Sequence, residues 1–136
     1  MTAPLTALSS EEEIFRDTVR AFASRELAPR AQKQDAQGHY DPDVVPKLFE
    51  LGVMAIETPA EWGGGGGSFF LSVLAIEELS RADAAVAVLV DAQNTLVANA
   101  LLRFAAPELR QRVLSCMAKD TFVSHCALLG LRNCSP

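Results

Sequence analysis

The chain has 136 residues, of which 17 are acidic and 12 are basic, so its formal net charge is −5. This length fits one domain, and a composition of 49% hydrophobic and 21% charged residues is typical of a folded protein rather than a disordered one. The sequence pI of about 5.0 argues against nucleic-acid binding. The longest apolar run, 84–90, is too short to span a membrane. We therefore expect a soluble single-domain protein.

The metal-binding and thiol residues are few and scattered. The chain has three cysteines, Cys116, Cys126 and Cys134. Their odd number and the lack of a CxxC pair predict free thiols in a reducing compartment. His39 and His125 stand apart from other ligand-type residues, so we expect no metal site. Residues 1–8 contain no Arg or Lys and are expected to be a flexible N-terminus without a transit peptide; either none is needed, or the chain begins after one.

The first helical signal begins at Ser9. A capping box is formed by Ser9 with Glu12 or by Ser10 with Glu13. Apolar residues then recur at helical spacing, namely Phe15, Val19, Phe22, Ala23 and Leu27. Pro29 predicts the end of this helix, and the polar residues 30–40 predict a loop.

A second helix is predicted to start at Asp41, as its N-cap, with Pro42 in the first helical position. Its buried side holds Val44, Val45, Leu48 and Phe49, and Gly52 ends it. Residues 53–58 form a short apolar piece that fits either an extended segment or a helical turn.

Residues 59–67 form a loop that contains Trp62 and five consecutive glycines, Gly63–Gly67. Such a run can cradle a phosphate, but it lacks the Lys-Ser/Thr of a P-loop and does not follow a βαβ strand. A tight or flexible connector is the interpretation that the pattern favours.

Three further helices follow the glycine run. Ser68 caps the third, in which Phe69, Val73, Ile76 and Leu79 lie near one face. Glu77 and Glu78 lie largely outside that face, each solvated or salt-bridged. Asp83 caps the fourth, 84–104, which is apolar nearly all round its first two turns and is therefore expected to be central and buried. Pro107 and Glu108 open the fifth, whose inner face holds Leu109, Val113 and Met117.

No alternating strand pattern occurs before Phe122, so the predicted fold is all-α, a bundle of about five helices. Asp91, Gln93 and Asn94 interrupt its most apolar helix. Buried polar groups need partners, so these residues either hydrogen-bond to neighbouring helices or line a ligand pocket. No spacing of Ser, His, Cys and carboxylate residues indicates a catalytic site.

Several segments resemble the acyl-CoA dehydrogenase family, most closely its short/branched-chain branch. They are LSSEEEIFRDTVRAFASRELAPR at 8–30, FELGVMAIETPAEWGG at 49–64, VLAIEELSRADAAVAV at 73–88 and AQNTL at 92–96. The resemblance covers about residues 5–126 and implies the N-terminal helical domain, here 9–122. Residues 123–136 form a divergent tail in which the family's Ser/Thr-Glu and glycine turn do not follow Cys126, and no Glu occurs after Glu108.

The resemblance implies a function for the complete enzyme. FAD accepts a hydride from the β-carbon of an acyl-CoA while a Glu base removes the α-proton, made acidic by hydrogen bonds to the thioester carbonyl. Residues 91–95 would lie near the distal end of the acyl pocket, which makes Gln93 and Asn94 the substrate-pocket candidates. The missing later domains leave no catalytic or cofactor-binding residue to name. The family location is the mitochondrial matrix, or the cytoplasm if Met1 is the true start.

Two functions therefore remain open. The chain is either the N-terminal domain of an FAD-dependent acyl-CoA dehydrogenase, inactive and without tightly bound FAD by itself, or a non-catalytic helical module. Such a module would bind full-length subunits or be an unstable splice product. Phe69, Val73 and helix 84–104 would be covered by later domains, so their exposure predicts self-association as a homo-oligomer.

Overall fold

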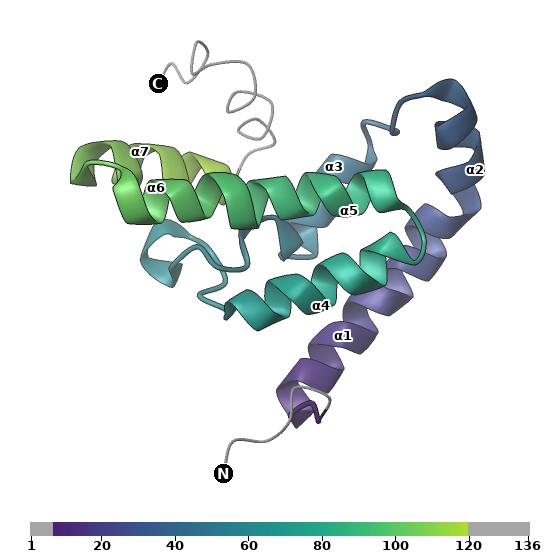
Figure 1. Cartoon of the computed structure of the whole chain (residues 1–136), viewed down its shortest axis with the longest axis horizontal. Coiled ribbons are helices and arrows are strands. Elements are labelled where there is room, and N and C mark those ends of the chain that lie inside the picture. Colours follow the sequence, from purple (N-terminus) through teal and green to yellow (C-terminus); the bar gives the residue numbers. More distant parts are fainter. Residues whose placement is uncertain (1–6, 120–136) are drawn as a thin grey trace.

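The computed structural model describes residues 7–119, and all regular structure in this range is helical (Figure 1). Five continuous helices span residues 10–37, 44–50, 69–80, 84–104 and 107–117. The predicted all-α fold is therefore confirmed. The two longest of these helices are interrupted by wide π-helical turns, which the sequence pattern did not indicate.

The first helix is longer than its proline suggested. It comprises α1 (Ser10–Phe22), the π-turn η1 (Ala23–Leu27) and α2 (Ala28–Gln37). The Ala28 N–H donates to the carbonyl of Ala23, five residues back. The regular α-helical hydrogen-bond pattern is therefore already interrupted just before Pro29, and the missing N–H of Pro29 does not end the helix. The predictions of an end at Pro29 and of a loop at 30–40 are therefore wrong. The helix ends at Gly38, whose φ of 70° is left-handed.

Of the caps predicted for the first two helices, one is confirmed and the other is wrong. The Ser9 capping box is confirmed, with the Glu12 carboxylate accepting from the Ser9 N–H at 2.7 Å. The second helix, α3 (Val44–Glu50), starts two residues later than predicted, and Asp43 is its cap residue. Asp41 instead makes the turn before it, because its Oδ1 accepts from the Asp43 N–H at 3.1 Å.

Short turns fill the connection from α3 to the next helix. Gly52, with φ of 82°, ends α3 as expected. Residues Val53–Ala55 then form the 3₁₀ turn η2, which decides between the two conformations left open for 53–58. A second 3₁₀ turn, η3 (Ala60–Trp62), precedes the glycine run.

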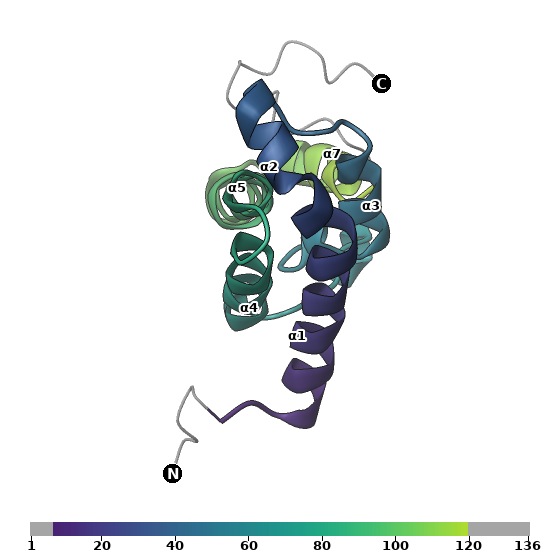
Figure 2. The same ribbon diagram turned by 90° about the vertical axis from the view of Figure 1, so that its right-hand side faces the viewer.

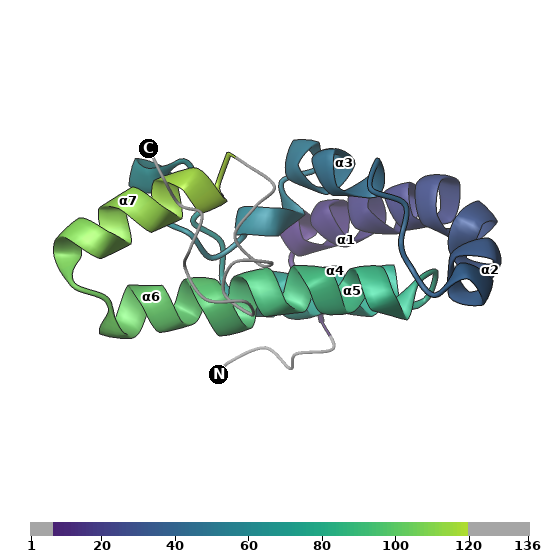
Figure 3. The same cartoon turned by 90° about the horizontal axis from the view of Figure 1, so that it is seen from above.

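The remaining helices begin where their capping residues predicted. The Ser68 hydroxyl accepts from the Leu71 N–H at the start of α4 (Phe69–Ser80), and Asp83 Oδ1 accepts from the N–H groups of Ala85 and Val86. The fourth helix consists of α5 (Ala84–Asp91), the π-turn η4 (Ala92–Ala98) and α6 (Asn99–Phe104). Helix α7 (Pro107–Met117) runs back along α6 (Figure 3).

The core has two parts. The larger lies where α1, α3, α4 and α5 meet, and its most buried side chains include Leu27, Leu48 and Leu79. The smaller joins α6 to α7 through Ala98, Val113, Leu114 and Met117, as the fifth helix's pattern predicted for two of them. Helix α4 packs against both α1 and α5 (Figure 2).

The apolar face that the sequence predicts for α4 is only partly buried. Its buried residues are Ser72, Leu74, Ala75, Glu78 and Leu79. Phe69 is 59% exposed and Val73 is 39% exposed, so their expected exposure in this chain is confirmed, whereas Leu79 is buried. Packing between α1 and α5 selects the face with small and ion-paired residues, and this leaves the aromatic face open.

The long helix 84–104 is buried on one side only. Val86, Ala87 and Val90 are buried, whereas Val88 is 64% exposed and Leu96 is 62% exposed. The expectation of a central, buried helix therefore holds for one side only, and the expected exposure of its other faces is confirmed. By length and composition this helix could cross a membrane, which is weak evidence because the core helix of a soluble protein passes the same test.

Candidate functional site

A buried polar junction lies where the π-turn η4 faces the turn η2. Its centre is Asn94, which is fully buried. Asn94 Oδ1 accepts from the Ile56 N–H at 2.9 Å, and its Nδ2 donates to the carbonyls of Val53 at 2.8 Å and Val90 at 2.9 Å. The side-chain amide thus replaces main-chain partners that the short η2 turn cannot supply. The sequence alternative of hydrogen bonds to neighbouring segments is confirmed for Asn94.

Gln93 is also buried but is poorly satisfied. Its Nε2 donates to the carbonyl of Met117 at 3.4 Å, which ties the long helix to the end of α7. Its Oε1 is buried and meets no hydrogen-bond partner among the described residues. Gln93 and Asn94 therefore point into the chain's own interior, toward α7 and η2 respectively, and their role in an acyl pocket stays a prediction.

The third polar residue of this helix, Asp91, lies half-buried at the start of the π-turn. The Thr95 hydroxyl donates to Asp91 Oδ1 at 2.6 Å and to its carbonyl at 2.9 Å. This pair lies one helical turn from the exposed Val88 and next to the exposed Leu96. The accessible side of the helix between residues 88 and 96 is therefore apolar, with one satisfied polar pair.

Glu57 completes the junction, and the sequence analysis did not single it out. Its Oε1 accepts from the Ser72 hydroxyl at 2.9 Å, and its Oε2 accepts from Asn99 Nδ2 at 3.0 Å. The carboxylate therefore links α4 to α6 across the segment that follows η2. A charged residue inside an otherwise apolar run (VMAIETP) is the signal that could have found it.

The glycine run does not form a phosphate cradle. All five of its N–H groups donate to carbonyls of residues 55–60, including Gly65 to Ala55 at 2.8 Å and Gly67 to Ile56 at 2.7 Å. A Cβ at position 64 would overlap the carbonyl group of Thr58. The run folds back against the preceding segment at a distance that only glycine allows, so its amides are not available to an anion. The connector interpretation is confirmed.

Glu78 is buried between α1 and α4 and is 3% exposed, so its predicted place outside the packed face is wrong. Its carboxylate accepts from Arg20 Nε and Nη2, each at 2.8 Å. This bidentate hydrogen bond from Arg20 holds the pKa of Glu78 below its ordinary value, against the opposing effect of burial. Glu77 pairs with Arg81 at 3.5 Å, so the prediction of solvated or salt-bridged carboxylates holds for both.

Glu26 is a second anchoring carboxylate. It accepts a hydrogen bond from Lys47 Nζ at 2.5 Å, which joins η1 to α3. Hydrogen bonds from Lys47 and then Arg25 lower the pKa of Glu26 to about 2. Both low-pKa carboxylates therefore tie helices together, and neither is placed to exchange protons with a substrate near neutral pH.

The candidate metal ligands do not gather within residues 7–119, where no three His, Cys, Asp or Glu residues lie close enough to hold an ion. Cys116 is exposed with a free thiol. His125, Cys126 and Cys134 lie outside the described residues. In the described part, the buried junction therefore holds the helices together, and the exposed surface around Val88 and Leu96 is apolar.

The chain is similar to a family model and to several known proteins. Residues 9–121 match the family model described as "Acyl-CoA dehydrogenase, N-terminal domain". The chain is 36% identical over 123 residues to a probable short/branched chain specific acyl-CoA dehydrogenase of Dictyostelium discoideum, covering 90% of this chain and 30% of that protein. It is 37% identical over 124 residues to the mitochondrial short/branched chain enzyme of Bos taurus, covering 91% and 29% respectively.

Solved structures show the same arrangement of helices. Butyryl-CoA dehydrogenase from Megasphaera elsdenii matches with a TM-score of 0.78 and 28% identity, covering 88% of this chain and 31% of that one. Glutaryl-CoA dehydrogenase from Mycobacterium smegmatis matches with a TM-score of 0.76 and 30% identity, covering 88% and 30%. The chain thus spans less than a third of the length of these relatives. It belongs to the acyl-CoA dehydrogenase family, as a match to the N-terminal helical domain.

Proposed function

We propose that this chain supplies the N-terminal helical domain for FAD-dependent α,β-dehydrogenation of a short or branched acyl-CoA. In this proposal the exposed side of α5 and of the π-turn η4 forms the distal wall of the acyl pocket. Its support is the apolar surface of Val88 and Leu96 around the satisfied Asp91–Thr95 pair. A wall of this kind favours the transfer of a short acyl chain out of water without leaving polar groups unpaired.

The residues of the described part contribute positioning in this function. Asn94 holds the π-turn against the η2 segment, and Glu57 holds the start of α6 against α4, so hydrogen bonds fix the position of the wall. The glycine run offers no free amide to the phosphates of FAD, so this loop does not fit the cofactor. FAD supplies the hydride acceptor in the complete reaction, and other parts of the enzyme hold it.

By itself, the 136-residue chain neither retains FAD nor oxidises acyl-CoA in this proposal. The support is that it covers only 29–30% of the relatives named for this activity. The bovine and rat relatives are named as mitochondrial proteins, and a mitochondrial location of this chain is part of the proposal. The proposal also includes association of the chain with full-length subunits or with a second copy of itself.

A domain exchange tests the proposed function. Residues 9–119 would replace the matching segment of the bovine short/branched-chain enzyme, and flavin content and acceptor reduction would be measured with 2-methylpropanoyl-CoA and butanoyl-CoA. We expect a yellow, active chimera and a colourless, inactive isolated chain. A folded chimera that holds FAD but oxidises neither substrate would contradict the proposal and favour a non-catalytic helical module. Activity of the isolated chain would contradict the proposal that the chain is inactive by itself.

A further inference from the structure

The long helix 84–104 carries an apolar stripe along its exposed side. The stripe takes every fourth residue, and its members are Ala84, Val88, Ala92, Leu96, Ala100 and Phe104. Ala92 is half-buried and the others are exposed, with Phe104, at 85%, the most exposed large apolar residue in the described part. Figure 2 shows this helix end-on at one edge of the molecule. The other elements within residues 7–119 therefore leave the stripe uncovered.

The π-turn η4 keeps this stripe on one side of the helix. In a regular α-helix each step of four residues turns by about 40° more than a full circle, so such a stripe would wind round to the packed side. The turns of η4 are wider and hold more residues, which reduces this drift between Ala92 and Ala98. Val88 and Phe104 lie on either side of η4, and both are exposed, in agreement with this geometry. The stripe therefore follows the helix for a length of about 30 Å.

Small and large side chains alternate along the stripe in an order that fits a second copy of the same helix. An antiparallel pairing about a twofold axis beside Asn94 places each large residue opposite an alanine. Phe104 then faces Ala84 of the second copy, Val88 faces Ala100, and Leu96 faces Ala92. Large residues opposite small ones allow two surfaces to interdigitate, and the twofold axis makes the interface self-complementary. A parallel pairing in register would instead set each large residue against its own copy and leave gaps between the alanines.

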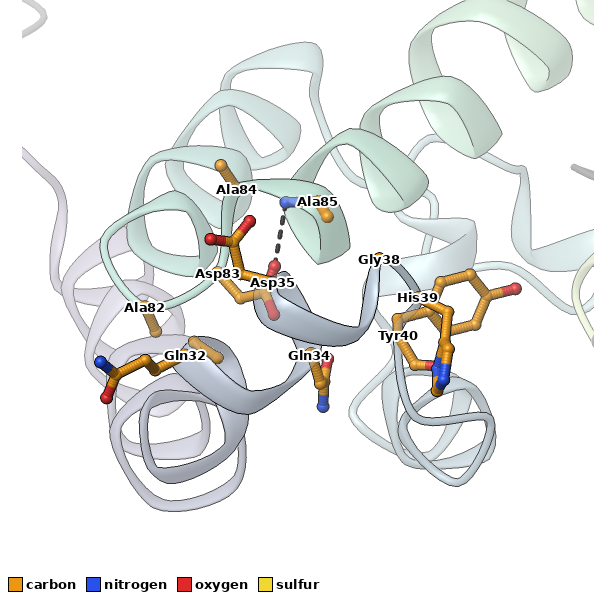
Figure 4. A pocket seen from close by; sticks show the side chains of 11 residues that line it. Gln32, Gln34, Asp35, Gly38, His39, Tyr40, Ala82, Asp83, Ala84 and Ala85 are labelled. Atoms are coloured by element: carbon orange, nitrogen blue, oxygen red, sulfur yellow. Dashed lines mark hydrogen bonds between the residues drawn. The ribbon is translucent and has the colours of Figure 1, made fainter.

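The two ends of the stripe carry opposite charges. Asp83 precedes its first residue, and the exposed Arg103 precedes its last. Figure 4 shows Asp83 beside a surface hollow at this end of the helix, where its Oδ1 accepts from the Ala85 N–H at 2.9 Å. Within residues 7–119 neither Asp83 nor Arg103 forms an ion pair. The antiparallel pairing brings Arg103 of each copy to the end where Asp83 of the other lies, so the charges favour the same orientation as the side-chain sizes.

We propose that the chain forms a symmetric antiparallel dimer through this stripe, with Ala92 and Leu96 of the two copies at its centre. The dimer rests on one part of the proposed function, the association with a second copy, and specifies its geometry. In the isolated chain the second copy covers the apolar surface that is the pocket wall of the complete enzyme. One pair of helices about 30 Å long is a small interface, so the dimer dissociates on dilution.

The test is the mass of the full 136-residue chain, measured by sedimentation equilibrium over a range of concentrations. We expect a reversible change from monomer to dimer without larger species, because a twofold interface closes on itself. A monomer at every concentration, or growth beyond the dimer, would overturn the proposal. This result is separate from the activity of the chimera, because the measurement uses the chain without the later domains.

An exchange of one facing pair tests the antiparallel register. Val88→Ala opens a gap, and Ala100→Val sets valine against valine. The twofold axis repeats each change, so each variant should raise the dissociation constant of the dimer about tenfold or more. The double variant Val88→Ala/Ala100→Val again places one valine opposite one alanine, and its dissociation constant should lie within about threefold of that of the unchanged chain.

Val73→Ala is the matched control, because it makes the same change on the exposed side of α4, outside the stripe. It should leave the dissociation constant unchanged. A double variant that dimerises as weakly as the single variants, or an equal loss with Val73→Ala, would overturn the proposed dimer.

Discussion

At the scale of single residues, Asn94 is the side chain that bonds to the most main-chain groups within residues 7–119. It satisfies one N–H and two carbonyls from two separate segments. The sequence indicated that a polar residue in this helix needs partners, and that inference was correct. The identity of the partners could not be predicted, because η2 is a single 3₁₀ turn whose position follows from tertiary packing.

Replacing Asn94 tests this structural role. Asn94→Leu keeps the volume but leaves the Ile56 N–H and the Val53 carbonyl buried without partners, so we expect the free energy of unfolding to fall by about 2–4 kcal/mol. Urea denaturation followed by circular dichroism measures the loss. Thr95→Val, whose hydroxyl bonds only within its own helix turn, is the matched control and should cost about 1 kcal/mol or less. Equal losses for the two variants would contradict the account.

Gly64 tests the close approach of the glycine run. Its Cβ would overlap the Thr58 carbonyl, so Gly64→Ala must displace backbone and should lower the free energy of unfolding by about 2 kcal/mol or more. Gly38→Ala is the control: its φ is 70° with open space around it, so only the left-handed conformation costs, about 1 kcal/mol. Thermal unfolding measures the loss of stability in both variants. A loss for Gly64→Ala that is no larger than that for Gly38→Ala would show that the Thr58 carbonyl does not restrict position 64.

At the scale of elements, the chain's hydrogen-bonding residues predicted helix starts better than its prolines predicted helix ends. Ser9, Ser68 and Asp83 act locally on their own N–H groups, so their roles can be derived from the sequence. Pro29 was misleading because the π-turn before it had already changed the hydrogen-bond register. A π-turn depends on packing along the whole helix, and no local pattern encodes it.

Burial faces were also predicted only in part. Helix α4 is apolar on most sides, so spacing alone did not decide which side packs. The structure selects the side that carries Glu78, because Arg20 of α1 forms two hydrogen bonds to it. Recognising this pair needs the relative position of two helices that are 58 residues apart in sequence. For the same reason, the Glu57 link between α4 and α6 was missed.

The two ion-paired carboxylates between helices predict acid sensitivity. Their folded-state pKa values lie below the ordinary 4.5, that of Glu26 at about 2. The stabilisation they give is therefore complete above pH about 4.5 and is lost as the pH falls toward 2. We expect the urea midpoint to decrease steadily between pH 5 and pH 2 by an amount that Glu26→Gln reduces. A midpoint with the same pH dependence in the variant would contradict the role of Glu26.

At the scale of the whole molecule, the described part exposes apolar side chains from several elements. Phe69 and Val73 lie on α4, and Val88 and Leu96 lie on the long helix. Exposed apolar surface of this kind promotes association. We expect the average mass by light scattering to increase with concentration, and Val88→Glu with Leu96→Glu to reduce this increase. Constant monomer mass for the unchanged chain would contradict the prediction.

The central claim is that these helices form part of an acyl-CoA dehydrogenase active site. The most direct measurement is the anaerobic absorption spectrum of the chimera that carries residues 9–119, recorded while a short branched acyl-CoA is added. This isolates the transfer of hydride to the flavin from later steps. We expect bleaching of the oxidised flavin bands in proportion to added substrate. A chimera with its flavin bound and a spectrum that stays unchanged would contradict it.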